Sequence, residues 1–365
     1  MSELVAAGEP MVYHLWQVFR IVAFWVAAEE DARPRLYDTA DLESLTFQIV
    51  EKQDVSDLPA CALVTIIAEI SGAKPRDSTI AFACLAVAEW ATGQQRVETA
   101  LSYFALAAGV ANDSRHAWTA GAMFRARGHV RDAGTWFRIA HAAATREKDW
   151  PTKVRALLSY AGMALHHGRY QDAHRKLLNA LRVSRKKHLT EHRGEVHHDL
   201  FVVGAAMGNH SIAHANAAAA SRHYGRKHPR LSRFAHDLAL YWIERGDYPH
   251  ALTVLLPLVE HHFSDEPHLL LLALSTAARA AAGARERSTF DALVVRFNNL
   301  RGTAPVEWPQ LAPALLHVAR GAIHLGELSL AKECLTESLQ SATRTEQHDV
   351  VSSAETLLRN VGSYA

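Results

Sequence analysis

The feature that most constrains this chain is a series of seven glycines at nearly equal spacing. The steps between them are 35, 40, 40, 38, 37 and 43 residues, and the glycines are Gly93, Gly128, Gly168, Gly208, Gly246, Gly283 and Gly326. Each glycine separates two stretches in which apolar residues recur at helical spacing. Because glycine readily adopts the left-handed conformation that ends a helix, this period indicates a repeated helix–turn–helix unit.

Small and large residues keep fixed places around these glycines. An alanine follows five residues after five of them, and Ser288 holds that place after Gly283; the alanines are Ala133, Ala173, Ala213, Ala251 and Ala331. Small residues let two helix backbones approach, and a large residue nearby fills the space beside them. One helix pair cannot bury its apolar face alone, so we expect successive pairs to stack.

This pattern resembles the tetratricopeptide repeat over roughly residues 79–345. The unit around Gly128 carries the family's small and large residues as Gly121, Phe124, Ala133, Phe137 and Ala140. The units around Gly168 and Gly246 match similarly. Others depart: the Gly208 unit has Phe201 at the small site and Ala217 at the large one, and the Gly93 unit has Glu98 where alanine is expected, with Ala100 two residues later.

The resemblance implies an all-α fold, a right-handed superhelical solenoid of about seven helix pairs over residues 76–345. Residues 1–75 would form an N-terminal helical cap or divergent repeats, and residues 346–365 a C-terminal capping helix. The units of about 40 residues are also similar to the repeat portion of bacterial peptide-pheromone receptors. That second likeness implies a bacterial regulatory protein that binds a peptide or a protein partner.

Composition narrows the class of protein. The formal charge is +1, too close to zero for bulk attraction to nucleic acid or membrane, and the three cysteines are far apart in the sequence. No disulfide or zinc framework follows, and we expect a cytoplasmic protein. The apolar stretch 11–28 contains His14 and Arg20, which favours a buried first helix over a membrane anchor. A contact between copies of the chain through Trp16, Phe19 and Trp25 is the alternative use of this stretch.

No motif for nucleotide, dinucleotide, serine-hydrolase or zinc-protease chemistry occurs in the sequence. We therefore expect a non-enzymatic protein without a cofactor. The densest group of histidines spans residues 188–228, and Glu195 and His198 have the spacing of one helix face. That group is interpreted as ordinary surface histidine, as a metal site or as a pH-responsive surface.

In tetratricopeptide arrays the first helix of each pair lines a concave groove, at places 13, 10, 6, 3 and 2 residues before the turn glycine. Counting back from the glycines predicts a polar lining that suits a peptide or protein segment with acidic groups, or simply an exposed polar surface. The predicted groove residues are Arg115, Trp118, Arg125, Arg155, His166, Glu195, His198, Arg233, His236, Glu244, Arg320 and His324.

A run of basic residues on a second helix offers the alternative function. It consists of Arg175, Lys176, Arg182, Arg185, Lys186 and Lys187, followed by Arg193. Such a run is either a solvated outer face or a patch that binds phosphates, as in a nucleic-acid-associated regulator. No aromatic residue lies within it, so stacking on single-stranded bases is not indicated.

Overall fold

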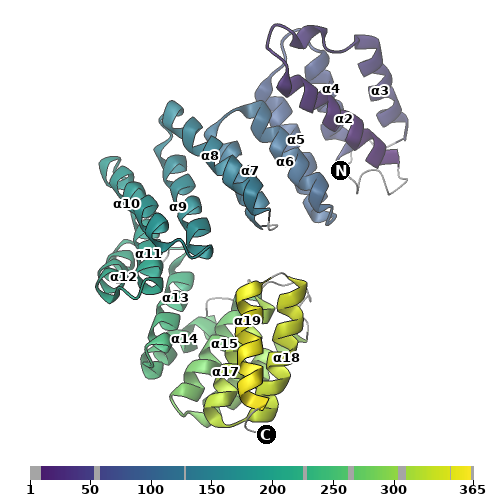
Figure 1. Ribbon diagram of the computed structural model, residues 1–365. Coiled ribbons are helices and arrows are strands. Elements are labelled where there is room, and N and C mark those ends of the chain that lie inside the picture. The colour runs from purple at the N-terminus through teal and green to yellow at the C-terminus, as the bar shows by residue number, and fades with distance from the viewer. Residues whose placement is uncertain are drawn as a thin grey trace. The chain divides into compact units, whose positions relative to one another are not determined.

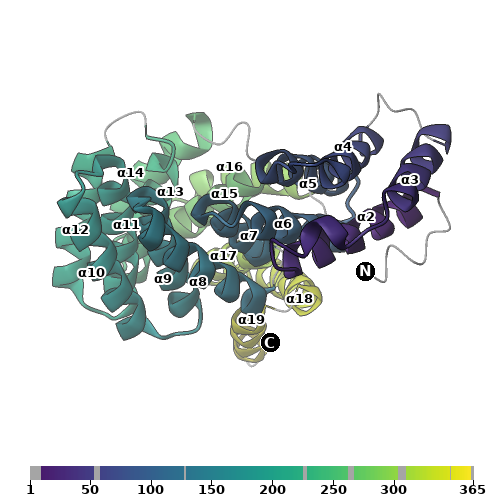
Figure 2. The same ribbon diagram turned by 90° about the horizontal axis from the view of Figure 1, so that it is seen from above.

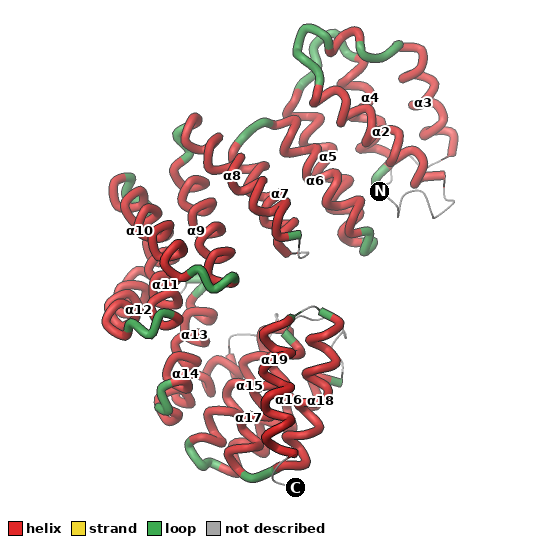
Figure 3. Tube along the Cα trace, in the orientation of Figure 1, coloured by secondary structure: helices red, strands yellow, loops and turns green. Residues whose placement is uncertain are grey.

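A computed structural model describes residues 10–52, 58–126, 129–224, 228–261, 267–302, 310–345 and 347–362. Every regular element in these ranges is a helix, and connecting segments are short (Figure 3). The predicted all-α fold is confirmed. Gly128, one of the seven spaced glycines, lies outside the described residues.

The N-terminal helices are α2 (Pro10–Ala27), the 3-10 turn η1 (Arg33–Arg35), α3 (Thr39–Lys52) and α4 (Ala60–Ser71). Antiparallel pairs follow: α5 (Asp77–Gly93) with α6 (Val97–Ala111), α7 (Ser114–Ala126) with α8 (Val130–Glu147), and α9 (Trp150–His166) with α10 (Tyr170–Lys186). Next come α11 (Thr190–Ala206), α12 (His210–Tyr224), α13 (Leu231–Glu244), α14 (Tyr248–His261), α15 (Pro267–Gly283) and α16 (Arg287–Arg301). The chain continues with α17 (Leu311–Leu325), α18 (Leu328–Arg344) and α19 (His348–Gly362).

The helices group into two compact units, which we call unit 1 (Met1–Met207) and unit 2 (Gly208–Ala365). In unit 1, each helix of the series α7, α8 and α9 packs against the others, as the view from above shows (Figure 2). In unit 2, α17 packs against α15, α18 and α19 (Figure 1). The division falls at Gly208, in the repeat whose size pattern departs from the rest.

The repeat cores are built from the predicted small and large residues. The side chain of Phe137 lies against Gly121, where an added Cβ would stand 2.7 Å from the ring carbons. Phe137 and Ala140 are fully buried, as are Ala173, Leu177 and Ala180 in the next pair. Glycine at position 121 therefore permits close helix packing and is not a turn residue.

The left-handed turn residue differs from the predicted glycine in two repeats. Gly168, Gly208, Gly246 and Gly326 have positive φ, between 66° and 76°. In the Gly93 and Gly283 repeats the left-handed residues are Gln95 (φ 58°) and Arg285 (φ 63°), two positions later. Both turns keep the hydrogen bond from the next N–H to the carbonyl five residues back, as Arg96 donates to Ala91 and Glu286 to Ala281.

This shift explains why those two repeats match the family poorly. Ala100, five residues after Gln95, is buried. It takes the place of the small residue that counting from Gly93 had put at Glu98. Five residues after Arg285 stands Phe290, a large residue at a small site. Space for it comes from Gly321 on α17, where an added Cβ would be 3.0 Å from the Phe290 ring. The small residue of this contact is on the neighbouring helix, so the helices still pack closely.

Helix α2 is a buried first helix, as its hydrophobic pattern predicts. It packs on α4 and α6, and the Tyr103 hydroxyl donates a hydrogen bond of 2.8 Å to the Leu15 carbonyl. Of the three residues suggested for a contact between copies, Trp25 is only 2% exposed and lies beneath the Arg33 guanidinium, so it offers little surface for such a contact. Trp16 and Phe19 are partly buried. Among the described helices, none combines the length and apolarity that crossing a membrane requires.

Candidate partner-binding faces

In unit 1, three predicted groove residues come together on α7 and α9, and we call Trp118, Arg125 and Arg155 the unit 1 face. The Arg155 guanidinium lies over the Trp118 ring, 5.5 Å from its centroid. The Trp118 indole donates a 3.2 Å hydrogen bond to the Ser159 hydroxyl, which fixes the ring. Arg125 is exposed, and a Cβ added at Gly162 would stand 3.8 Å from its Nη1. Arg155 thus covers an anchored aromatic ring, and Arg125 lies about two turns further along α7, over the Phe137 ring.

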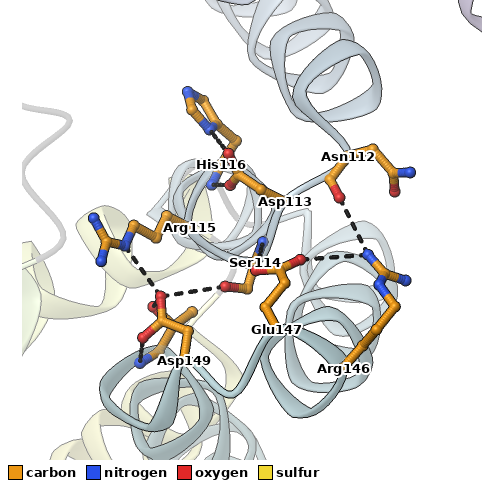
Figure 4. A network of polar contacts seen from close by, with 9 residues as sticks. Asn112, Asp113, Ser114, Arg115, His116, Arg146, Glu147 and Asp149 are labelled. Atoms are coloured by element: carbon orange, nitrogen blue, oxygen red, sulfur yellow. Dashed lines mark hydrogen bonds and ion pairs between the residues drawn. The ribbon is translucent and has the colours of Figure 1, made fainter. Parts of the chain in front are cut away.

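Arg115 has a structural partner within the chain. Its Nε donates a 3.0 Å hydrogen bond to Asp149, the residue that precedes α9 (Figure 4). Asp149 also accepts from the Thr152 backbone N–H at 3.2 Å, and so caps α9. Burial raises the pKa of Asp149, but the hydrogen bonds from Thr152 and Arg115 outweigh it and the net pKa is lowered. The Arg115 side chain therefore ties the first turn of α7 to the residue before α9.

The same network joins the connector before α7 to the one before α9. Glu147 accepts a 3.1 Å hydrogen bond from the Ser114 backbone N–H, and Arg146 donates to the Asn112 carbonyl at 3.3 Å (Figure 4). Arg146 also donates to Glu147 at 3.3 Å. Successive repeats of unit 1 are thereby held at their connecting segments as well as through their cores.

The remaining predicted residues of unit 1 lie in different environments. His166 is exposed at the end of α9, where its ring meets that of His167 edge-on. Glu195 on α11 is partly buried. His198 is only 2% exposed, so the structure places it in the core and not on a groove surface. Burial of α11 on more than one side accounts for this, since Val196 and Leu200 beside His198 are buried too.

In unit 2 the predicted residues lie on α13 and α17. Arg233 and Glu244 are exposed, Arg320 is half-buried, and His324 is exposed with its Nε2 3.4 Å from the Tyr248 hydroxyl. His236 is buried, contrary to the expectation of a groove surface, and its Nε2 lies 3.1 Å from the Thr276 hydroxyl on α15. His236 therefore bridges α13 and α15 within the unit.

One charged residue of unit 2, Arg279, was not predicted from the sequence. Arg279 on α15 is 7% exposed, its Nη1 is 2.9 Å from Glu244, and the same nitrogen is 3.4 Å from His317 Nδ1. Counting from Gly283 puts Ala277 at the place six residues before the turn. Counting from Arg285, the actual left-handed residue, puts Arg279 there, and Arg320 holds the same place before Gly326. The sequence signal for Arg279 is a single arginine within an alanine-rich run.

The charges of this group influence one another. Burial lowers the pKa of His317 well below its ordinary value, and the neighbouring charges of Arg279 and Arg320 lower it further. Burial also lowers the pKa of Arg320, with a contribution from Arg279. His317 is accordingly neutral and accepts from the Arg279 guanidinium.

The basic patch lies on α10 and its exit turn. Arg175 is 2.7 Å from Asp172, the Lys176 ammonium lies 5.5 Å from the Tyr160 ring centroid, and the Lys187 ammonium lies 4.3 Å from that of Trp150. Arg182, Arg185 and Lys186 are exposed. Half of the predicted patch thus contacts its own unit, and three cations face solvent.

The histidines of 188–228 are dispersed over α11, α12 and their connectors. His197 and His198 are buried, whereas His210 and His214 lie on α12 with their rings edge-on to Tyr241. In the ranges that the structure describes, no three His, Cys, Asp or Glu side chains are placed to hold one metal ion.

Comparisons with known proteins support the helical-repeat fold. No protein-family model matches the chain, and no curated protein matches it. Among solved structures, apo RapI is similar with a TM-score of 0.56 at 13% identity, covering 73% of this chain and 99% of RapI. The Rap conjugation gene regulator of plasmid pLS20, in complex with the Phr* peptide, has a TM-score of 0.55 at 12% identity, covering 91% and 96%.

A third similar structure is a Rap protein complexed with competence and sporulation factor, with a TM-score of 0.51 at 11% identity, covering 96% of this chain and 98% of that one. Structural similarity at such low sequence identity establishes only the fold, so the function has to be inferred from the site. The chain has a tetratricopeptide-like helical-repeat fold with a distant likeness to the Rap pheromone-receptor regulators.

Proposed function

We propose that this protein is a non-enzymatic regulatory adaptor that binds a peptide or protein segment on the first helices of its repeats. The observation that carries the proposal is the unit 1 face, where the Trp118 ring is fixed by Ser159 and covered by Arg155. Tryptophan and arginine are the residues most often responsible for binding energy in protein interfaces. Arginine's planar fork also suits the carboxylates of an acidic segment.

The likeness to Rap structures supports the same kind of ligand. Two of the similar structures are complexes, one with the Phr* peptide and one with competence and sporulation factor. Tetratricopeptide-like repeats suit this role because neighbouring first helices present side chains at regular intervals to an extended chain. The ligand proposed here is a segment with acidic groups, held by Arg125 and Arg155 beside Trp118.

Native mass spectrometry of the protein purified from its own host tests the proposal. We expect a peptide or protein at fixed stoichiometry, lost from Trp118→Ala and Arg125→Glu variants that retain the parent circular dichroism. Arg182→Glu, on the opposite helix of the next pair, is the matched control and should retain the partner. Equal capture by all three variants would place binding elsewhere on the molecule.

A second candidate function rests on Arg182, Arg185 and Lys186, which are exposed on α10. We propose that they would contact phosphates in a nucleic-acid-associated regulator. Three contacts predict that the logarithm of the association constant falls with the logarithm of salt concentration with a slope of roughly −3. Nucleic acid in the native spectrum, lost from Arg182→Glu but kept by Arg125→Glu, would favour this function over peptide binding.

A further inference from the structure

We propose that Arg279 and Arg320 of unit 2 form a binding site for a carboxylate group, and that Glu244 occupies part of this site until a ligand displaces it. The ligand would be a peptide carboxylate, from an acidic side chain or a C-terminus. This inference rests on the proposed peptide-binding function and specifies the chemistry of one contact.

The hydrogen bonding of Arg279 leaves the edge of the guanidinium that pairs with carboxylates unused. Both interactions of Arg279 use Nη1, at 2.9 Å from Glu244 Oε1 and 3.4 Å from His317 Nδ1. Its Nε is buried and has no hydrogen-bond partner among the described residues. A buried N–H without a partner is unfavourable, and a carboxylate that bridges Nε and Nη2 would satisfy it.

Arg320 supplies a second positive charge on the adjacent helix. It is half-buried, and it interacts electrostatically with Glu244 as well as with Arg279. It stands at the same place before its turn as Arg279 does before Arg285. Gly321, next to Arg320, brings the two helices together, because a Cβ added there would lie 3.2 Å from the Arg279 Cα.

The charge balance favours a singly charged ligand. The two guanidinium groups have one carboxylate nearby, that of Glu244, and the neutral His317 adds no charge. A ligand carboxylate that takes the place of Glu244 would keep this balance of one carboxylate against two guanidinium groups. Glu244 is 63% exposed at its side chain, so its carboxylate can leave for water without the cost of moving a buried charge.

The test uses the full-length protein and a defined probe, N-acetyl-dialanine with a free C-terminal carboxylate, compared with its C-terminal amide and with inorganic phosphate at constant ionic strength. Binding is followed through the Arg279 Nε–H resonance in nitrogen–proton correlation spectra, assigned by its absence in Arg279→Gln. We expect the acid to shift this resonance saturably and the amide to leave it unchanged. Arg320→Gln should weaken acid binding at least tenfold, while Lys332→Gln at an exposed site on α18 should bind as the parent does.

Glu244→Gln tests the displacement, and we expect tighter binding of the acid because the competing carboxylate is gone. Weaker binding would show that Glu244 orients Arg279 and is not displaced. Equal shifts with acid and amide, no shift with either, or tighter binding of phosphate would overturn the carboxylate site. Partner capture that depends on Trp118 and Arg125 would stand in all of these cases, so failure of this inference is separable from failure of the proposed function.

Discussion

The ring of Tyr248 lies directly across Gly283, so that a Cβ added to this glycine would stand 2.3 Å from Tyr248 Cδ1 and 2.5 Å from Cγ. The Tyr248 ring at the start of α14 thereby covers the end of α15. Its hydroxyl oxygen lies 3.4 Å from Nε2 of His324 on α17. Gly93, the corresponding glycine of the first repeat, has no atom within 4 Å of the same position. Neither glycine has a positive φ.

The two glycines should respond to alanine in opposite directions. Gly283→Ala must displace the Tyr248 ring near its attachment point, and overpacking of this kind costs about 1–3 kcal/mol. Gly93→Ala meets open space in a helical conformation and should stabilise the protein by up to about 1 kcal/mol. Urea unfolding followed by circular dichroism measures both. A stable Gly283→Ala protein would mean that Tyr248 packs elsewhere.

The repeat register can be tested in unit 1 at Ala173, which is fully buried between α9 and α10. Ala173→Leu should lower the free energy of unfolding by about 1–3 kcal/mol because the helix pair has no room for the added carbons. Ala142→Leu, at an exposed site on α8, is the control and should change it by less than about 0.5 kcal/mol. Identical unfolding curves for the two variants would refute the register.

Asp149 should contribute to stability in a pH-dependent way. Its pKa in the folded protein is lowered from 3.8, so its contribution is complete above the unfolded-state pKa and is lost as pH falls through the folded-state value. At neutral pH, Asp149→Ala removes the cap of α9 and should cost about 0.5–2 kcal/mol. The difference from the parent should shrink below pH 4.

Asp149→Asn is the matched variant for this site, because asparagine keeps the capping oxygen and removes the ion pair with Arg115. We expect it to retain most of the stability at neutral pH, since an exposed ion pair contributes little. If Asp149→Asn were as unstable as Asp149→Ala, the link to Arg115 would matter more than the cap.

The displaced turn residues allow a stabilising change. Arg285 has a φ of 63°, a conformation that costs a residue with a side chain about 1–2 kcal/mol. Arg285→Gly should therefore raise the thermal midpoint, whereas Gly326→Ala, at φ 75°, should lower it. Differential scanning calorimetry of both variants checks the prediction, and a lower midpoint for Arg285→Gly would show that glycine's greater flexibility in the unfolded chain outweighs the relief of strain.

The all-α repeat fold, the cores of the best-matching repeats and the buried first helix were predictable from the sequence. They depend on local periodicity and on the sizes of residues such as Phe137, Ala173 and Leu177, which pack within their own helix pair or the next. Counting back along regular repeats also puts Trp118, Arg125 and Arg155 on first helices, and they lie on α7 and α9.

Tertiary structure decided what depends on contacts between repeats. Gln95 and Arg285, and not the glycines two positions before them, adopt the left-handed turn. In the Arg285 repeat, the packing at Gly283 and Phe290 depends on Tyr248 and on Gly321 of neighbouring helices. That shift brings Arg279 beside Arg320. Whether histidines 198 and 236 face solvent or the core was likewise decided by the helices packed against them, because a residue's burial depends on its neighbours in space and only partly on its place in a helix.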